Sequence, residues 1–495
     1  MRVREMTDKS AIVIGSGFGG LAAAVRLLAR GYRVTVLEKL DGPGGRASVF
    51  RQDGFSFDAG PTIITAPYIL EELWALSGRR MADHLDLRRM DPFYKIRFDD
   101  GDVFNASADI AQVRREVARI APDEAAQFDR YLKDSEAIYN TAFKDLADVP
   151  FDKISTLLRA APDLIRLQGY RTVFSKVGDY FTNPKLRVAF SYHPLLIGGN
   201  PLTTTAYYCL IAHLERLHGV HYAMGGTAAL VSALVKLIEA EGGTVRYQAE
   251  VDHITTSGRR ATGVQLGNGE TLAADIVVSN ADAAWTYGKL LGNHPRRVWT
   301  DRKLARQSYS MGLFVWYFGT SRQYHDVYHH TIMLGPRFEE LLRDIFTRKT
   351  LAEDFSLYLY RPTATDPSVA PPGCDNFYAL VPVPNLDGKT DWPSYAETFR
   401  ARIQKRLEST ILPGLGESII TSRVMTPADF KTRLNSVKGA GMSLEPKLFQ
   451  SAWFRPHNRS EELDNLFLVG AGTHPGAGVP SVILSAKVME QRLPD

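Results

Sequence analysis

The chain has 495 residues, of which 44% are hydrophobic and 23% are charged. This length exceeds one ordinary hydrophobic core and predicts two or more domains, and the composition excludes wholesale disorder. A formal net charge of +4, from 59 basic and 55 acidic residues, is too balanced for a nucleic-acid-binding protein.

The number of cysteines and the length of the hydrophobic runs indicate the cellular compartment of the protein. Two cysteines, Cys209 and Cys374, are too few for a disulfide framework or a cysteine-based metal site, and we expect no metal. Residues 1–10 are polar and carry both charge signs, so no secretory signal is expected. The longest apolar run, residues 311–318, is too short to span a membrane and predicts a buried strand. These features favour the cytoplasm.

The N-terminal pattern predicts a dinucleotide-binding unit. Its parts follow one another as strand, glycine turn, helix, strand and acid: residues 11–14, the G-x-G-x-x-G spacing at Gly15, Gly17 and Gly20, residues 21–30, residues 32–37, and Glu38. Gly15 permits the tight turn, Gly17 lets the backbone approach a pyrophosphate, and Gly20 lets the helix pack on the strand. The helix N-terminus attracts the phosphates, and Glu38 accepts hydrogen bonds from the ribose hydroxyls.

The next segment favours FAD over NAD. Gly44-Gly45-Arg46 resembles the extension found in the amine-oxidase-like flavoprotein superfamily. The resemblance implies that this backbone and the arginine approach the FAD pyrophosphate and ribityl chain. The alternative is a surface turn with a solvated arginine. Residues 55–61 then predict a short strand and a turn close to the cofactor.

Residues 151–181 combine apolar and basic side chains on helices that we expect to break at Pro162 and Gly169. This combination is typical of an interfacial membrane segment. An amphipathic helix that covers a core is the alternative.

Further pieces complete the predicted cofactor domain. A helix opens after Gly225-Gly226, and residues 244–254 form a strand whose Val251 backbone could touch the adenine. Residues 262–266 and 271–279 form a hairpin that turns at Asn268-Gly269. We therefore expect an α/β protein with a Rossmann-like, doubly wound FAD-binding domain assembled from residues 10–75, 222–285 and 455–495.

The two inserts, residues 76–221 and 286–454, are expected to build a mixed-sheet substrate-binding region with a helical, membrane-facing part. The alternation in residues 313–318 suggests sheet. As a set, the aromatic residues of the second insert suit a long apolar cavity: Tyr309, Phe314, Trp316, Tyr317, Phe318, Phe355, Tyr358, Tyr360, Phe377 and Tyr378.

A second strand–glycine–helix unit lies near the C-terminus. Residues 465–470 predict a strand, residues 471–480 a glycine-rich turn, and Ser481 the N-cap of a last helix. We expect its backbone N–H groups to face the ribityl chain and the pyrimidine end of the flavin. His474 either donates a hydrogen bond beside the flavin or shapes the turn.

Almost end to end, the sequence resembles the bacterial CrtI-type phytoene desaturase family. The resemblance rests on blocks that occur in order: residues 15–20, 43–46, 57–62, 193–201, 225–226, 279–282, 450–458 and 470–480. It implies stepwise dehydrogenation of the hydrocarbon phytoene towards neurosporene or lycopene, with FAD as the only organic redox cofactor and a quinone or oxygen as electron acceptor. It also implies peripheral attachment to the cytoplasmic side of the cell membrane, and an oligomer is compatible with it.

Three alternatives stay open at this point. A later carotenoid desaturase or a carotene isomerase is a close one, and an amine oxidase lacks support because nothing marks an aromatic cage for an amine. A prenyl-lipid-binding protein without FAD chemistry, such as the Rab GDP-dissociation inhibitors, conflicts with the two intact FAD-contact regions.

Phytoene has no polar group, so a site can hold it only by apolar burial, at ~25 cal/mol per Å². Its dehydrogenation needs a hydride acceptor and a weak base or water that takes a proton. The candidates for the base are His474, Asp58 and Asp163. Arg159 either positions a reacting group or binds lipid phosphate.

The expected cofactor contacts are Gly15, Gly17, Phe18, Gly19, Gly20, Glu38, Lys39, Gly44, Gly45, Arg46, Pro61, Thr62, Val251, Gly470, Ala471, Gly472, Thr473, Gly478 and Val479.

Overall fold

The computed structural model describes residues 8–494, so the first seven residues of the polar N-terminal segment lie outside the described part. Strands from both ends and from the middle of the chain form a parallel five-stranded sheet, in the order β10 (Thr244–Arg246), β2 (Arg33–Leu37), β1 (Ser10–Ile14), β14 (Ile276–Ser279) and β20 (Leu466–Leu468). All five strands come from the three segments predicted for the FAD-binding domain, whose bounds stay a prediction.

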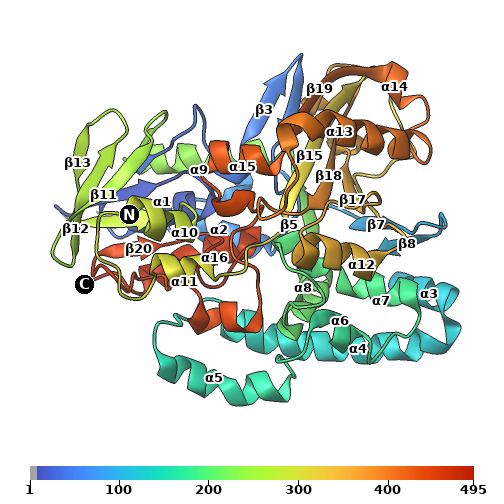
Figure 1. Ribbon diagram of the computed structural model, residues 1–495, viewed down its shortest axis with the longest axis horizontal. Helices are drawn as coiled ribbons and strands as arrows, with labels where there is room; N and C mark the ends of the chain where they lie inside the picture. Colours follow the sequence, from blue (N-terminus) through green and yellow to red (C-terminus); the bar gives the residue numbers. More distant parts are fainter. Residues whose placement is uncertain (1–7, 495) are drawn as a thin grey trace.

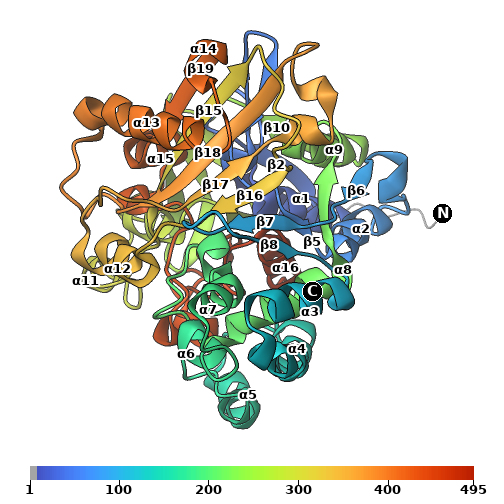
Figure 2. The same cartoon turned by 90° about the vertical axis from the view of Figure 1, so that its right-hand side faces the viewer.

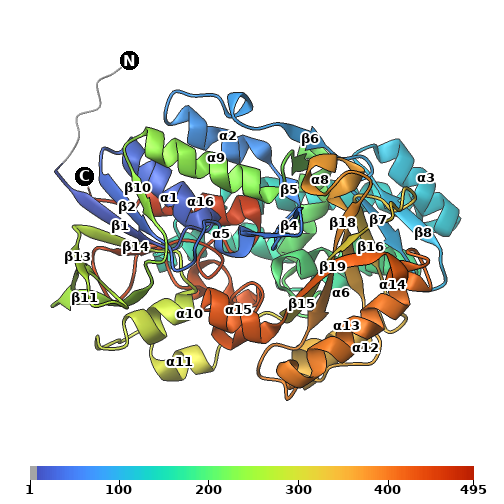
Figure 3. The same ribbon diagram turned by 90° about the horizontal axis from the view of Figure 1, so that it is seen from above.

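Successive side chains of β1 point to opposite faces of the sheet and are apolar on both, which explains why both faces are covered. Ala11 and Val13 pack into the core shared with α1 (Phe18–Ala29), α9 (Thr227–Ala240) and α16 (Val479–Glu490). Ile12 and Ile14 pack on the opposite side, against the antiparallel sheet of β11 (Val251–Ser257), β12 (Arg260–Leu266) and β13 (Thr271–Ala273). Figure 3 shows these helices and the small sheet on opposite sides of the parallel strands.

The N- and C-terminal segments are joined by ion pairs around one buried arginine. Arg26 of α1 donates to Glu72 of α2 (Pro67–Ala75) at 2.6 Å and to Glu490 of α16 at 2.8 Å. Because both carboxylates hold one buried guanidinium, α16 is anchored beside α1 although more than 450 residues separate them.

Three local predictions are wrong. Residues 244–254 form two strands in different sheets, β10 and β11, because the chain turns at Gln248, whose φ is +53°. The last helix begins at Val479 with Gly478 as its N-cap, and Ser481 makes no cap. Pro162 lies inside one continuous helix, α5 (Ile154–Arg166). This helix is exposed around Pro162, so solvent reaches the carbonyl that proline leaves unpaired.

The predicted hairpin is confirmed around Asn268-Gly269, where β12 pairs with β13, but its second arm ends at Ala273, and residues 276–279 form β14 of the parallel sheet. The second predicted sheet is also present and is mixed. It has seven strands, antiparallel except between β16 and β7, in the order β19 (Ile419–Met425), β15 (Gly312–Thr320), β18 (Asp375–Val383), β17 (Leu357–Tyr360), β16 (His330–Met333), β7 (Tyr94–Arg97) and β8 (Val103–Ala106).

Residues from the first insert form a helical region below this sheet in Figures 1 and 2. It contains α3 (Ile110–Ile120), α4 (Ala125–Ile138), α5, α6 (Val173–Val177), α7 (Pro184–Ser191) and α8 (Leu210–His218). Helix α5 lies at the lower edge of the molecule in both views. Within residues 8–494, no helix has the length and apolar character needed to cross a bilayer.

Shorter elements connect these parts. Two small sheets are β3 (Val49–Gln52) with β4 (Phe55–Asp58), and β5 (Ile64–Thr65) with β9 (Val220–Ala223) and β6 (Leu87–Arg89). The remaining helices are α10 (Ala283–Trp285), α11 (Asp301–Ala305), α12 (Phe338–Arg343), α13 (Trp392–Glu408), α14 (Leu415–Ser418) and α15 (Pro427–Leu434).

Candidate active site

Two glycine turns from opposite ends of the chain border one cavity of about 550 Å³. Gly15 after β1 and Gly470 after β20 have φ angles of +89° and +97°, a region that favours glycine. A Cβ on Gly19 would lie 2.9 Å from the Gly470 nitrogen, so the two turns approach each other closely. Both turns lie at the carboxyl ends of parallel strands, where open α/β sheets bind ligands.

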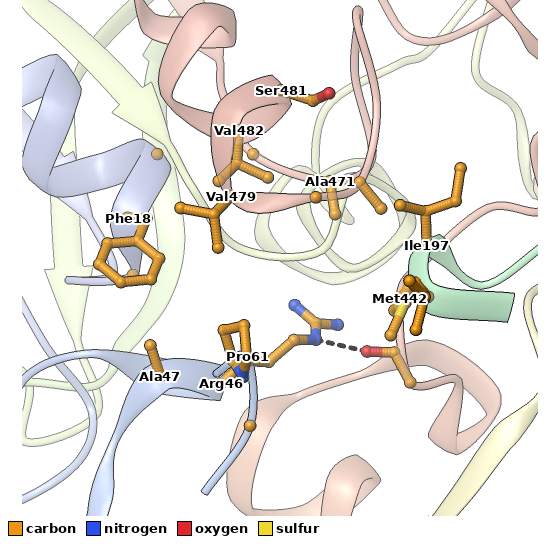
Figure 4. Close-up of a pocket in the computed structure, with 18 of the residues that line it drawn as sticks. Phe18, Arg46, Ala47, Pro61, Ile197, Met442, Ala471, Val479, Ser481 and Val482 are labelled. Carbon is orange, nitrogen blue, oxygen red and sulfur yellow. Dashed lines mark hydrogen bonds between the residues drawn. The ribbon is translucent and has the colours of Figure 1, made fainter. Parts of the chain in front are cut away.

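The residues of this cavity fit a bound dinucleotide. Gly17 and Gly478 are the N-cap residues of α1 and α16, and neither N-terminus has a side-chain cap. Both glycines border the cavity, so the unpaired N–H groups and positive dipole ends of two helices face the same space. Figure 4 shows Phe18 and Val479, from these two helices, facing that space together with Ala471.

Arg46 supplies a partly buried positive charge beside the cavity. Its Nε donates to the Gly441 carbonyl at 2.8 Å, the bond drawn in Figure 4, and another nitrogen donates to Ser436 Oγ at 3.0 Å. Burial lowers the pKa of Arg46, and the nearby Asp282 carboxylate opposes this shift. Because its hydrogen-bond partners are neutral, the guanidinium is available to attract a phosphate.

Two charged residues at the end of β2 have separate roles. Glu38 is buried and accepts hydrogen bonds from the Ser16 and Leu40 backbone nitrogens, both at 2.9 Å, which orients its carboxylate at the cavity wall. Lys39 also borders the cavity, but its ammonium is held by Asn435 at 2.8 Å and Glu250 at 3.1 Å.

The structure places most of the predicted cofactor contacts along this cavity. Sixteen of them border it: Gly15, Gly17, Phe18, Gly19, Glu38, Lys39, Gly44, Gly45, Arg46, Pro61, Thr62, Val251, Gly470, Ala471, Gly478 and Val479. The other three, Gly20, Gly472 and Thr473, lie behind the turns. A Cβ on Gly20 would sit 2.1 Å from the Gly15 carbonyl oxygen, and Thr473 donates to the Pro456 carbonyl. These assignments stay predictions.

Asn280 is a cavity residue for which the sequence patterns predicted no role. It follows β14, and its side-chain amide would clash with a Cβ on Gly17 or on Gly19, at 2.8 and 2.6 Å. It therefore packs against the first glycine turn. Its position directly after an apolar strand of the parallel sheet was the available signal.

The same cavity continues into an apolar chamber, which we define as the part bordered by residues of the two inserts. One wall is the seven-stranded sheet and the other is helical. Its aliphatic and aromatic members include Phe143, Leu146, Leu157, Leu164, Leu195, Ile197, Ile211, Leu214, Leu313, Val315, Ile332, Leu334, Leu357, Leu380, Met442 and Phe454.

The prediction that the aromatic set lines this chamber is wrong for most of its members. Only Tyr358 and Tyr378 border it. Along β15, Phe314, Trp316 and Phe318 project to the opposite face and pack in the core beneath α13. The alternation was predicted, but the larger side chains occupy the face that points away from the chamber.

The candidate catalytic residues occupy three different environments. His474 borders the cavity, with Nε2 3.3 Å from the Leu146 carbonyl oxygen. Asp58 does not border it: its carboxylate accepts the Tyr360 hydroxyl at 2.9 Å and backbone N–H groups at the start of α9, and burial raises its pKa to about 6. Arg159 and Asp163 are exposed on α5 and do not border the cavity either. Asp58 and Asp163 are thus not placed to reach a substrate there.

Burial lowers the pKa of His474 from 6.5 to about 4. The unfolded chain therefore binds this proton more strongly between pH 4 and pH 6.5, and acidification through that window lowers the free energy of unfolding by about 3 kcal/mol. We expect His474→Gln to lose this part of the pH dependence in denaturant titrations at a series of pH values. His325→Gln, at an exposed site, is the control and should keep it. Equal slopes for wild type and His474→Gln would contradict the assignment.

Comparison with protein families and curated proteins agrees with this geometry. Residues 18–488 match the family of flavin containing amine oxidoreductases. The chain is 50% identical over 490 residues to a neurosporene-forming phytoene desaturase from Cereibacter sphaeroides, covering 98% of this chain and 94% of that protein. It is 46% identical over 480 residues to a lycopene-forming phytoene desaturase from Pantoea ananas, covering 97% and 98%.

Solved structures show the same mixed α/β fold at low sequence identity. A putrescine oxidase bound to putrescine has a TM-score of 0.65 and 13% identity, over 99% of this chain and 98% of that chain. A cyclohexylamine oxidase from Brevibacterium oxydans has a TM-score of 0.60 and 15% identity, over 98% and 97%.

Proposed function

The chain belongs to the flavin-containing amine oxidoreductase family, among the bacterial phytoene desaturases, and from this premise we propose that it introduces conjugated double bonds stepwise into phytoene, with FAD as its cofactor. The products are neurosporene or lycopene, and the pathway is carotenoid biosynthesis. One observation carries the proposal: a single cavity joins the two dinucleotide-binding turns to an apolar chamber.

The residues of the chain divide the work between the two parts of this cavity. The N-termini of α1 and α16 and the Arg46 guanidinium would hold FAD. FAD bound by these residues would supply the hydride acceptor, and a quinone or oxygen would take up the electrons. The apolar chamber binds the hydrocarbon by burial and keeps water away from the reacting carbons.

The position of helix α5 supports the proposal that the substrate enters the chamber from a membrane. Its inner side chains Leu157 and Leu164 border the chamber, whereas Leu158 and Ile165 are about two thirds exposed, at 65% and 64%. Phe449 is 73% exposed and follows Leu448, which also borders the chamber. Two neighbouring segments thus have one apolar side on the chamber and another on the surface. We name Ile154, Leu158, Ile165, Tyr170 and Phe449 the docking face.

The charges around the docking face favour an anionic lipid surface. Lys153, Arg159 and Arg166 are exposed on or beside α5, and Asp163 pairs with Arg166 at 3.1 Å. Exposed bases near a membrane surface contribute about 1 kcal/mol each with anionic lipid. We therefore propose that the protein binds peripherally to the cytoplasmic side of the cell membrane. The two free cysteines, Cys209 and Cys374, support a cytoplasmic location.

A reconstitution tests the function directly. Purified protein with FAD, phytoene in liposomes and a quinone is expected to convert the substrate into coloured products. A yellow, neurosporene-like absorption spectrum means three desaturation steps, and a red, lycopene-like spectrum means four. Phytoene recovered unchanged, or converted only into isomers of equal conjugation length, would contradict the proposal, provided that the preparation contains flavin.

A further inference from the structure

The apolar chamber contains one carboxylate among the described residues that border it, Glu215 of α8. Its side chain is 5% exposed. The hydroxyl of Tyr94, on β7, donates to Oε1 at 2.6 Å, and Nε2 of His193 lies 3.5 Å from Oε2. Three separate elements therefore hold this carboxylate in place.

The other acidic side chains that border the cavity belong to the end where the dinucleotide would bind. Glu38 accepts two backbone N–H groups after β1 and β2, and Glu250 pairs with Lys39. Asp282 accepts the Ala284 N–H at the start of α10 and faces Arg46. Glu215 differs from them in its partners. In the described part of the chain, no backbone N–H group and no basic side chain other than His193 lies within hydrogen-bonding or ion-pair distance of its carboxylate.

An ionised carboxylate can accept about four hydrogen bonds, and two partners leave part of that capacity open. Burying a carboxylate beside hydrocarbon side chains is unfavourable by several kcal/mol, so apolar packing gives no reason for its presence. Carboxylates in such environments are frequent at catalytic sites.

We propose that Glu215 is the base that accepts the proton in each desaturation step. This inference rests on the proposed function. One C–H bond of the substrate loses its hydrogen as a hydride to the flavin, and the neighbouring C–H bond loses a proton to Glu215. The electron pair of the second bond becomes the new C=C bond, and an O–H bond forms on the carboxylate. His193, 3.5 Å away, provides the next position for that proton.

Glu215→Gln tests the proposal, because glutamine keeps the shape and the hydrogen bond from Tyr94 but cannot act as a base. We expect a turnover number at least about 100-fold below wild type. Flavin content, the midpoint of thermal unfolding and the affinity for phytoene measured by tyrosine fluorescence quenching should be unchanged. Glu136→Gln is the matched control, since Glu136 is exposed on α4, the helix that packs on α8.

The outcomes separate the inference from the proposed function. Inactive wild type contradicts both. Active wild type with an equally active Glu215→Gln overturns only the role of Glu215. If Glu215→Gln does not retain flavin, Glu215→Asp replaces it: a shortened base is expected to keep a measurable fraction of the turnover at unchanged affinity for phytoene, and full wild-type turnover would overturn the proposal.

Discussion

Gly17→Val is expected to purify without flavin, whereas the wild-type protein is expected to be yellow. Gly17 has φ −68° and ψ 170°, which valine can adopt, so the effect comes from space and not from backbone strain. A Cβ here would lie 2.8 Å from Asn280 Nδ2, and the branched side chain would project into the cavity at the N-terminus of α1. We expect FAD affinity to fall by about 100-fold or more, the equivalent of about 3 kcal/mol.

Gly42→Val is the matched control in the same region. Apart from its chain neighbours, a Cβ on Gly42 would meet no atom of the described residues within 4 Å, and Gly42 does not border the cavity. Flavin absorbance of the purified proteins and FAD titration of the apoproteins measure the difference, with thermal unfolding to confirm that both variants fold. Wild-type FAD affinity in Gly17→Val would remove the basis for placing the cofactor at this turn.

The double variant Leu158→Asp/Ile165→Asp is expected to lose liposome binding and, with it, turnover of phytoene supplied in liposomes. Inserting a large aliphatic side chain into an apolar phase gains about 1.5–3 kcal/mol, so two of them together account for at least about a 100-fold change in partitioning. The added negative charges oppose binding to anionic lipid further. Because both side chains are exposed, the fold and the FAD content should not change.

Ile420→Asp separates this effect from a general loss of surface hydrophobicity. Ile420 is 53% exposed on β19, at the opposite end of the molecule from α5 in Figures 1 and 2. Sedimentation with vesicles of anionic and of neutral lipid measures binding, and turnover of detergent-solubilised phytoene should be retained by the double variant. Equal vesicle binding by wild type and the double variant would exclude the docking face.

The two glycine turns were predictable because their requirements are local. A glycine turn after an apolar strand, followed by a helix and an acid such as Glu38, can be recognised within about 30 residues, and the turn around Gly470 follows the same logic. Contact between the two turns is decided by the tertiary structure and not by the local sequence. It depends on β1, β14 and β20 being neighbours in one sheet, and on Asn280 packing beside the glycines.

The catalytic candidates were harder to predict because burial and direction depend on distant elements. Asp58 is the last residue of β4, the strand that leads to the cofactor turn, yet its carboxylate points towards the start of α9 and Tyr360. Glu215 lies in an ordinary amphipathic helix, and nothing in its neighbourhood along the chain marks it. Its position in the chamber emerges only when β7 and the segment after α7 are packed against α8.

By itself, the sequence determined the cofactor class, the α/β fold and the family, because glycine spacing, strand and helix periods and long matching blocks are properties of short segments. Tertiary structure decided which face of β15 lines the chamber, which acidic side chain enters it, and that the outer side of α5 stays uncovered. Those outcomes depend on contacts between residues far apart in the chain, where the free energy of burial is shared among several elements and no local pattern reports it.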